Sequence, residues 1–257
     1  MKSFLARSDR GALALAALGS ALAWVYLLWM AWGMEHMNAG LILMPGMTEW
    51  TVADLALVFL MWSVMMAGMM LPTAAPMLMA FGAVSRRVDP VRPTRDLLAF
   101  CAGYLLIWAG FSAAAALLQW GLLRWRLVSP AMMSTSAWLS GGFLCLAGVY
   151  QFTRWKAACL LVCQAPMAFL VKQWRTGWWG ALVMGLRHGA FCLGCCWALM
   201  ALLFVLGVMN LWWIAALSLF VMAEKAFPAA AWLPRIAGSG LCAWGLWLIG
   251  RGVFAPT

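Results

Sequence analysis

Long uncharged apolar segments are the feature that most constrains this chain. Three of them run from Gly11 to Met34, from Leu55 to Ser85 and from His188 to Ala223, which are 24, 31 and 36 residues. A helix needs only about 20 apolar residues to cross the hydrocarbon core of a bilayer. Charged residues make up 9% of the chain, against about 25% in a soluble domain. The chain therefore cannot cover itself with a polar surface, and a soluble globule is excluded.

The continuity of the apolar segments predicts an all-α, polytopic bundle of membrane-spanning helices. A transmembrane β-barrel would instead show segments of about ten residues that alternate between apolar and polar. We expect about seven spans, with six as the alternative, in a single transmembrane domain that covers residues 1–257. The expected spans are 11–33, 52–72, 96–119, 132–152, 188–208, 210–227 and 236–254.

Three boundaries carry further expectations. Pro72 and Pro76 should kink or end the second span, because proline lacks an amide donor and clashes with the preceding turn. A tight hairpin should join the fifth and sixth spans around residues 207–210. Residues 153–176, which combine basic residues with two cysteines and a proline, should form a helix that lies at the inner face of the membrane.

The basic residues predict an orientation. The chain has 17 Lys and Arg and a net charge of +10, and basic residues gather in the short cytoplasmic loops of membrane proteins. With the N-terminus inside, all of them lie inside except Arg124, Arg126 and Arg251. The charge then sets topology and attracts anionic lipid, and we expect no nucleic-acid partner.

A cluster of cysteines is the strongest candidate site. His188, Cys192, Cys195 and Cys196 stand at i, i+4, i+7 and i+8, positions that share one face of a helix. With the span starting at His188, this face would lie in the inner half of the membrane. Cys159 and Cys163 form a second pair, at i, i+4 spacing, on the same predicted side. That side is reducing, which disfavours structural disulfides and favours thiolate ligation of a soft metal.

Methionines supply a second set of soft ligands. Met65, Met66, Met69 and Met70 line the second span, where Met61 extends the stripe by one turn. More sulfur ligands crowd the first outer loop; they are Met30, Met34, Met37, Met44 and Met47, with His36 among them. Together they would make a path from an outer methionine loop to the inner thiols. The alternative is that methionine only fills packing gaps, and we favour that for any single residue.

Glu224 and Lys225 are the charged pair inside the sixth span. Ionisable groups at membrane depth are functional candidates, and counting from the hairpin places Glu224 at the depth of Cys195. Glu224 could be a metal ligand, a partner of a ligand or a proton acceptor. The alternative, with equal weight, is that both residues snorkel to the inner interface. Cys101, Cys145 and Cys242 are isolated in apolar spans and are expected to be small core residues.

The chain resembles a bacterial family labelled "predicted metal-binding integral membrane protein". The motifs that carry the resemblance are Met65-Met66-Ala67-Gly68-Met69-Met70-Leu71-Pro72, Tyr150-Gln151-Phe152-Thr153 followed by Lys156, Cys159, Cys163 and Pro166, Cys192-Leu193-Gly194-Cys195-Cys196-Trp197, and Glu224-Lys225. The resemblance implies a multi-pass protein of the bacterial inner membrane and a bound metal. It does not extend to His188, and Arg154 stands where the family has a proline.

Three functions remain as hypotheses. The first is Cu(I) handling by a chaperone, acceptor or transporter, because thiolates and thioethers select Cu(I); zinc is the alternative metal. Its partners would be a metallochaperone or another membrane subunit. The second is a thiol oxidoreductase that uses Cys192 and Cys195, whose spacing is CxxC. The third is a structural or assembly subunit without a metal. We favour the first, which is not an enzyme.

Overall fold

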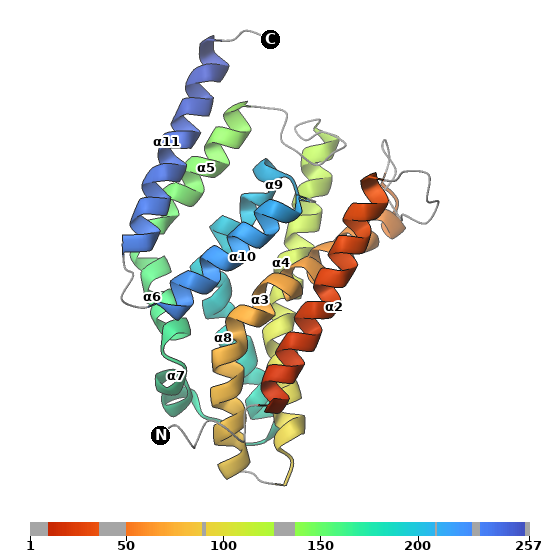
Figure 1. Cartoon of the computed structure of the whole chain (residues 1–257), viewed down its shortest axis with the longest axis vertical. Helices are drawn as coiled ribbons and strands as arrows, with labels where there is room; N and C mark the ends of the chain where they lie inside the picture. Colours follow the sequence, from red (N-terminus) through yellow and green to blue (C-terminus); the bar gives the residue numbers. More distant parts are fainter. Residues whose placement is uncertain are drawn as a thin grey trace.

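The structure is a computed structural model and describes residues 10–35, 50–88, 91–125, 137–208, 210–227 and 232–254. These residues form helices and their connections, without a strand. In chain order the helices are α2 (Arg10–Glu35), α3 (Val52–Val88), α4 (Pro93–Arg124), α5 (Ala137–Gln151), α6 (Arg154–Gln164), α7 (Pro166–Gln173), α8 (Gly177–Ala201), α9 (Leu203–Leu206), α10 (Leu211–Ala226) and α11 (Trp232–Phe254). Most of them run lengthwise along the molecule, with the described ends of the chain at opposite ends (Figure 1). The expected all-α class is thus confirmed.

The number of spans is not settled by the helices. Four stretches, at 11–33, 52–88, 93–124 and 177–206, are long and apolar enough to cross a membrane. A fifth arises if α6 and α7, which meet at an angle of 89°, count as one broken span. Within the described residues this gives four or five candidates, so seven spans and an inside N-terminus stay predictions. The expectation of a single helix over 153–176 is wrong, because the chain bends sharply before Pro166 and forms two helices, α6 and α7.

Helix α3 continues through both of its prolines, so the span expected to stop at residue 72 extends to Val88. Pro72 cannot donate a helical hydrogen bond to the carbonyl of Gly68, four residues earlier. The hydroxyl of Ser20, from α2, donates to that carbonyl at 3.0 Å. Side chains from a neighbouring helix thus satisfy a backbone group that the proline leaves open, as is required in an apolar environment.

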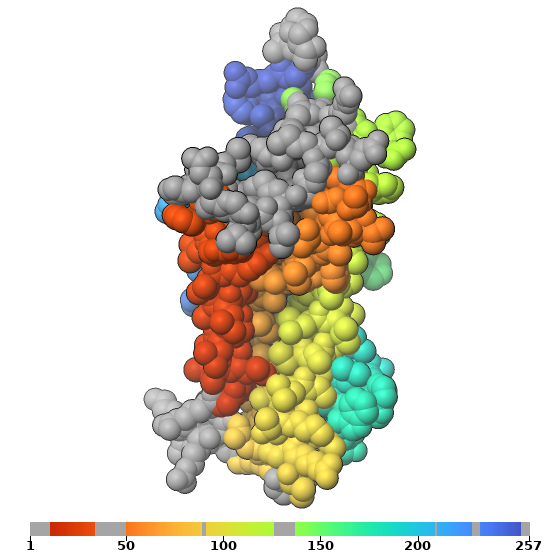
Figure 2. All heavy atoms as spheres, turned by 90° about the vertical axis from the view of Figure 1, so that its right-hand side faces the viewer, coloured from red at the N-terminus to blue at the C-terminus, as the bar shows by residue number. Residues whose placement is uncertain are grey.

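Apolar side chains face outward along α2. Leu18, Leu22 and Val25 are 65%, 70% and 63% exposed, and Figure 2 shows α2 as an outer column of the molecule. Isolated exposed leucines are ordinary in soluble proteins, but here they continue along one long helix. Such a surface suits contact with lipid chains.

Helices α5 and α11 form a closely packed pair at one side of the bundle (Figure 1). Their contact brings together two cysteines that stand isolated in the sequence, Cys145 and Cys242. The Sγ of Cys145 lies 3.9 Å from the carbonyl oxygen of Cys242, and the Sγ of Cys242 lies 3.9 Å from that of Cys145. The two residues face each other across the helix pair, where both are half-buried.

Candidate metal centre

The cysteine cluster lies on α8, near the middle of a long helix. The span expected to begin at His188 begins eleven residues earlier, at Gly177, and with α9 it continues to Leu206. At a rise of 1.5 Å per residue, Cys192 is about 22 Å from the start of this helix and about 21 Å from its end. Arg187 lies inside the helix, and its guanidinium donates to the side chain of Gln173 on α7. The expectation that Cys192 lies in the inner half of the membrane stays a prediction.

Helices α4 and α8 pack very closely beside the site. A Cβ atom added to Gly103 would lie 2.3 Å from the carbonyl oxygen of Leu182, and one added to Gly185 would lie 2.0 Å from that of Phe100. Small residues let two helix backbones approach this closely. Tyr104, the neighbour of Gly103, is thereby held against α8, with 1% of its surface exposed.

Cys192 is the centre of a polar cluster inside the bundle. Its sulfur lies 3.1 Å from the hydroxyl of Tyr104 and 3.1 Å from the ammonium of Lys225, which comes from α10. The same ammonium donates to the hydroxyl of Thr73 on α3 at 2.9 Å. Tyr104 also lies 3.1 Å from the carbonyl oxygen of Met70. Four helices thus contribute to one buried group of contacts around a thiol.

The other cysteines of the predicted site lie around Cys192. The thiols of Cys195 and Cys196 both donate to the carbonyl oxygen of Cys192 at 3.0 Å, and all three residues are at most 1% exposed. Cys163, from α6, is within hydrogen-bonding reach of the Cys192 and Cys195 thiols. Cys159, one turn earlier on α6, contacts the backbone of α8 beside Gly194 and is partly exposed. The structure therefore brings the two predicted cysteine groups together.

These thiols fit a soft metal by chemistry, although their present arrangement is not a finished site. All eight cysteines are free. Among the residues described, no three His, Cys, Asp or Glu side chains converge so that they could hold a metal ion together. Cu(I) accepts two sulfur ligands, and thiolates favour it. A two-sulfur site is therefore the arrangement that needs least movement here.

The methionine stripe is buried, and its last member reaches the cluster. Met65, Met66, Met69 and Met70 are each 0% exposed. The sulfur of Met70 lies 3.9 Å from the hydroxyl of Thr73, which is the group that also contacts Lys225. Met65, Met66 and Met69 pack in the same buried core as the cysteines of α8. The outer residues Met34, His36, Met37, Met44 and Met47 lie outside the described side chains.

His188 is buried among aromatic rings. Its imidazole stacks on the ring of Tyr104, with centroids 5.9 Å apart, and meets the edge of Phe169 at 5.5 Å. It is 3% exposed, and its Nδ1 atom has no hydrogen-bond partner among the described residues. The contact with Tyr104 places it next to the cluster, and a ligand role stays a prediction.

Glu224 belongs to a separate ion pair. Both of its carboxylate oxygens accept from the ammonium of Lys156 on α6, at 2.7 and 2.8 Å, and the two side chains are at most 2% exposed. Lys156 also donates to the side chain of Gln151. Glu224 is therefore buried and paired with Lys156, and it does not snorkel. Its role as a metal ligand or as the partner of a ligand stays a prediction.

Three residues of this region were not predicted as site residues from the sequence. Tyr104 and Thr73 lie inside uncharged segments, where nothing in the pattern separates them from other core residues. Lys156 is among the residues that carry the family resemblance and was otherwise counted as a charge of the inner loop. Its position three residues before Cys159 was an available signal, because both then share a face of α6.

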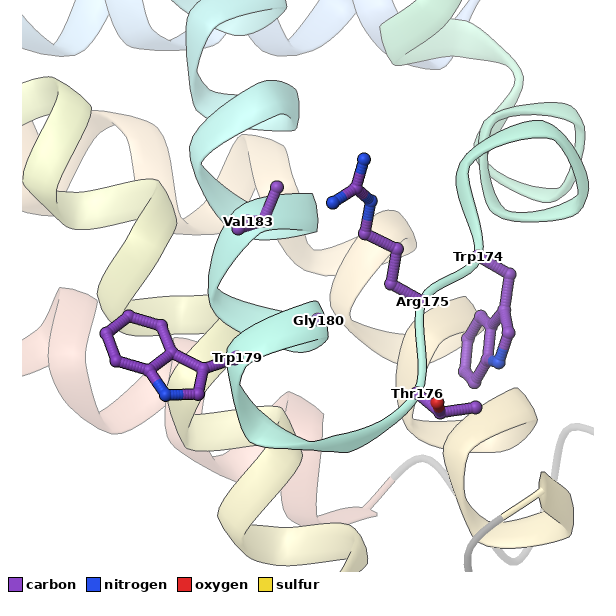
Figure 3. Close-up of a pocket in the computed structure, with 6 residues that line it drawn as sticks. All are labelled: Trp174, Arg175, Thr176, Trp179, Gly180 and Val183. Atoms are coloured by element: carbon purple, nitrogen blue, oxygen red, sulfur yellow. The ribbon is translucent and has the colours of Figure 1, made fainter.

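A surface hollow of about 500 Å³ lies away from the cysteines, where the connection after α7 enters α8 (Figure 3). It is lined by Trp174, Arg175, Thr176, Trp179, Gly180 and Val183. None of the predicted sulfur ligands borders it. The candidate centre is thus a packed interior cluster and not an open pocket.

The fold and the site define a helical protein, apolar enough for a membrane, with an interior cluster of soft ligands. Comparison with protein families gives the more specific class. Residues 59–248, which include the candidate cysteines, His188, Glu224 and the methionines of α3, match the family described as PpoB2, copper chaperone. The chain belongs to this copper chaperone family. Neither the comparison with curated proteins nor that with solved structures gives a match.

Proposed function

We propose that this protein is a membrane-embedded copper chaperone that binds Cu(I) through Cys192 and at least one neighbouring thiol and passes it to a partner protein. The observation that carries the proposal is the gathering of thiols from α6 and α8 around Cys192. Cys163, Cys195 and Cys196 are the candidate second ligands, and Cys159 is the more exposed thiol beside them. Thiolates select Cu(I), with zinc as the competing metal.

Membership of a copper chaperone family supports copper as the cargo. A chaperone releases what it binds, and an incomplete site suits release better than a closed three- or four-ligand site does. Cu(I) would replace the thiol protons of two cysteines and leave an anionic dithiolate in the interior. Lys225 lies next to that position.

The methionines of α3 support a route towards the thiols. Thioethers bind Cu(I) without losing a proton, and they bind it more weakly than thiolates do. Met70 lies at the polar cluster, and Met69, Met66 and Met65 continue along the same helix. We propose that they form the approach to Cys192. His188, beside Tyr104, is an additional candidate ligand in this route.

The remaining parts of the proposal concern location and partners. Four to five helices are long enough to span a bilayer, and we place the protein in the bacterial inner membrane with seven spans and the N-terminus inside. Its partner would be a protein that accepts copper at the membrane. A thiol oxidoreductase is less well supported, since Cys192 and Cys195 are 0% and 1% exposed and offer no sulfur to a substrate.

Copper binding by the purified protein tests the proposal. The protein in detergent would be titrated with Cu(I) against a chromophoric chelator of known affinity, first as the parent chain and then as Cys192→Ser. Cys101→Ser is the matched control, because Cys101 is a buried cysteine of α4 outside the cluster. We expect tight binding by the parent and the control and a loss of at least about tenfold in Cys192→Ser.

Equal Cu(I) affinities in Cys192→Ser and the parent would refute the assignment of the site. A parent protein that binds no Cu(I) would refute the function. Zn(II) titrated in the same way shows which metal is preferred, and a preference for Zn(II) would also overturn the proposal.

A further inference from the structure

We propose that Lys225 is a charge filter, which makes the Cys192 site favour monovalent soft metal ions over divalent ones. The inference rests on the proposed Cu(I) site and adds a specificity-determining residue to it. Lys225 need not touch the metal. Its ammonium acts through space, from a fixed position next to the ligand sulfur.

The position of Lys225 is set by three helices. The residue lies in the last turns of α10, and its Nζ atom is held between the sulfur of Cys192 on α8, at 3.1 Å, and the hydroxyl of Thr73 on α3, at 2.9 Å. A metal bound to that sulfur must therefore lie within a few ångströms of the ammonium. The ammonium cannot withdraw without giving up both contacts.

Among the described residues, Lys225 has no carboxylate partner. The ion pairs found among the described residues are Arg95 with Asp96 and Lys156 with Glu224. Glu224, the immediate neighbour of Lys225, is thus already paired with another lysine. A partly buried ammonium beside a thiol and a hydroxyl is costly unless an anion forms next to it. A metal dithiolate is such an anion when the metal carries a single charge.

The filter follows from the charge of the metal. With two thiolates, Cu(I) forms a complex of charge −1, and the ammonium brings the total to zero. Zn(II) with the same ligands is neutral, so the ammonium leaves an excess of +1 inside the bundle. The repulsion between the ammonium and the metal is proportional to the metal charge, and a low dielectric magnifies it. At an equal number of thiolates, Lys225 therefore penalises a dication about twice as strongly as a monocation.

Isoelectronic metal ions isolate this effect. Cu(I) and Zn(II) have the same d¹⁰ configuration, as do Ag(I) and Cd(II), and the members of each pair differ by one unit of charge. Competition titrations would measure the affinities of all four ions for the full-length protein in detergent. The quantity of interest is the ratio of monovalent to divalent affinity within each pair.

The variants separate charge from shape. Lys225→Gln removes the charge and keeps a donor for Thr73 and Cys192, while Lys225→Arg keeps the charge. Lys172→Met removes a charge from an exposed position on α7 and is the matched control. If Lys225→Gln is poorly folded, judged by gel filtration and tryptophan fluorescence, Lys225→Met takes its place, because a neutral side chain of similar length preserves the packing.

We expect the monovalent-to-divalent ratio to fall at least about tenfold in Lys225→Gln for both ion pairs. The ratio should stay within about threefold of the parent in Lys225→Arg and Lys172→Met. An unchanged ratio in Lys225→Gln, or an equal loss of all four ions, overturns the filter while Cu(I) binding by the parent still supports the proposed function. If the parent protein binds neither Cu(I) nor Ag(I), that result refutes the proposed function and the charge filter together.

Discussion

The ammonium of Lys225 and the sulfur of Cys192 lie 3.1 Å apart, although 33 positions separate the two residues in the chain. This contact is possible because a short connection joins α9 to α10. Helix α9 ends at Leu206 and α10 begins at Leu211, so the chain reverses over four residues. Gly207, with φ of 94°, supplies a backbone conformation that other residues rarely adopt. Residues at similar distances from this turn then lie at the same depth.

The hydroxyl of Tyr104 should contribute to both stability and copper affinity. Tyr104→Phe removes its contacts with the Met70 carbonyl and the Cys192 sulfur, each at 3.1 Å, without creating a cavity. We expect a loss of about 1 kcal/mol in unfolding free energy and about tenfold in Cu(I) affinity. Denaturation in detergent and chelator competition would measure these. Tyr26→Phe on α2 is the control, and equal behaviour of the two variants would show that the Tyr104 hydroxyl has no special role.

The close contact between α4 and α8 should not tolerate a methyl group. Gly103→Ala would place its Cβ atom 2.3 Å from the Leu182 carbonyl oxygen, whereas Gly110 on the same helix has no atom within 4 Å of such a position. We expect Gly103→Ala to lower stability by about 1–3 kcal/mol and to weaken Cu(I) binding by displacing Tyr104. Gly110→Ala should be neutral or stabilising, because alanine favours helices. Melting temperatures of the two variants in one detergent compare them, and a more stable Gly103→Ala would contradict this packing.

The pair of Lys156 and Glu224 should matter for folding rather than for copper. Glu224→Gln leaves the Lys156 ammonium buried without its anion, which costs about 3–5 kcal/mol. The double variant Lys156→Met, Glu224→Leu should recover most of that loss, since an apolar pair of similar volume needs no counter-charge. Urea denaturation of the two variants would show the recovery. Cu(I) affinity in the double variant should stay within about threefold of the parent; its loss in a folded double variant would make Glu224 a ligand after all.

The facing positions of Cys145 and Cys242 can be tested by oxidation. Each sulfur lies 3.9 Å from the backbone carbonyl of the other residue, so mild oxidation in detergent should join them in an intramolecular disulfide. Peptide mass spectrometry would detect the linked fragments of α5 and α11. Cys101, on α4, serves as the internal control and should remain a free thiol. A Cys145 that links to Cys101 instead would refute the packing of α11 on α5.

The class of the protein and the candidate soft ligands could be predicted from the sequence. Uncharged segments longer than a bilayer requires predict helices without reference to any partner, because backbone groups in an apolar environment must be satisfied within one segment. The helical spacing of Cys192, Cys195 and Cys196 likewise places them on one face, and family membership supports copper as the metal.

The partners of those ligands depended on tertiary contacts. The pattern could not show that α3 passes through Pro72, because Ser20 of another helix satisfies the carbonyl that the proline leaves open. The pattern also could not show that two adjacent charged residues have different partners. Glu224 and Lys225 are neighbours in the chain, yet successive residues on a helix point about 100° apart. Glu224 therefore meets Lys156 on α6, and Lys225 meets Cys192 on α8. Sequence alone predicted the chemistry, and helix packing decided which charged residue lies beside the Cys192 thiol.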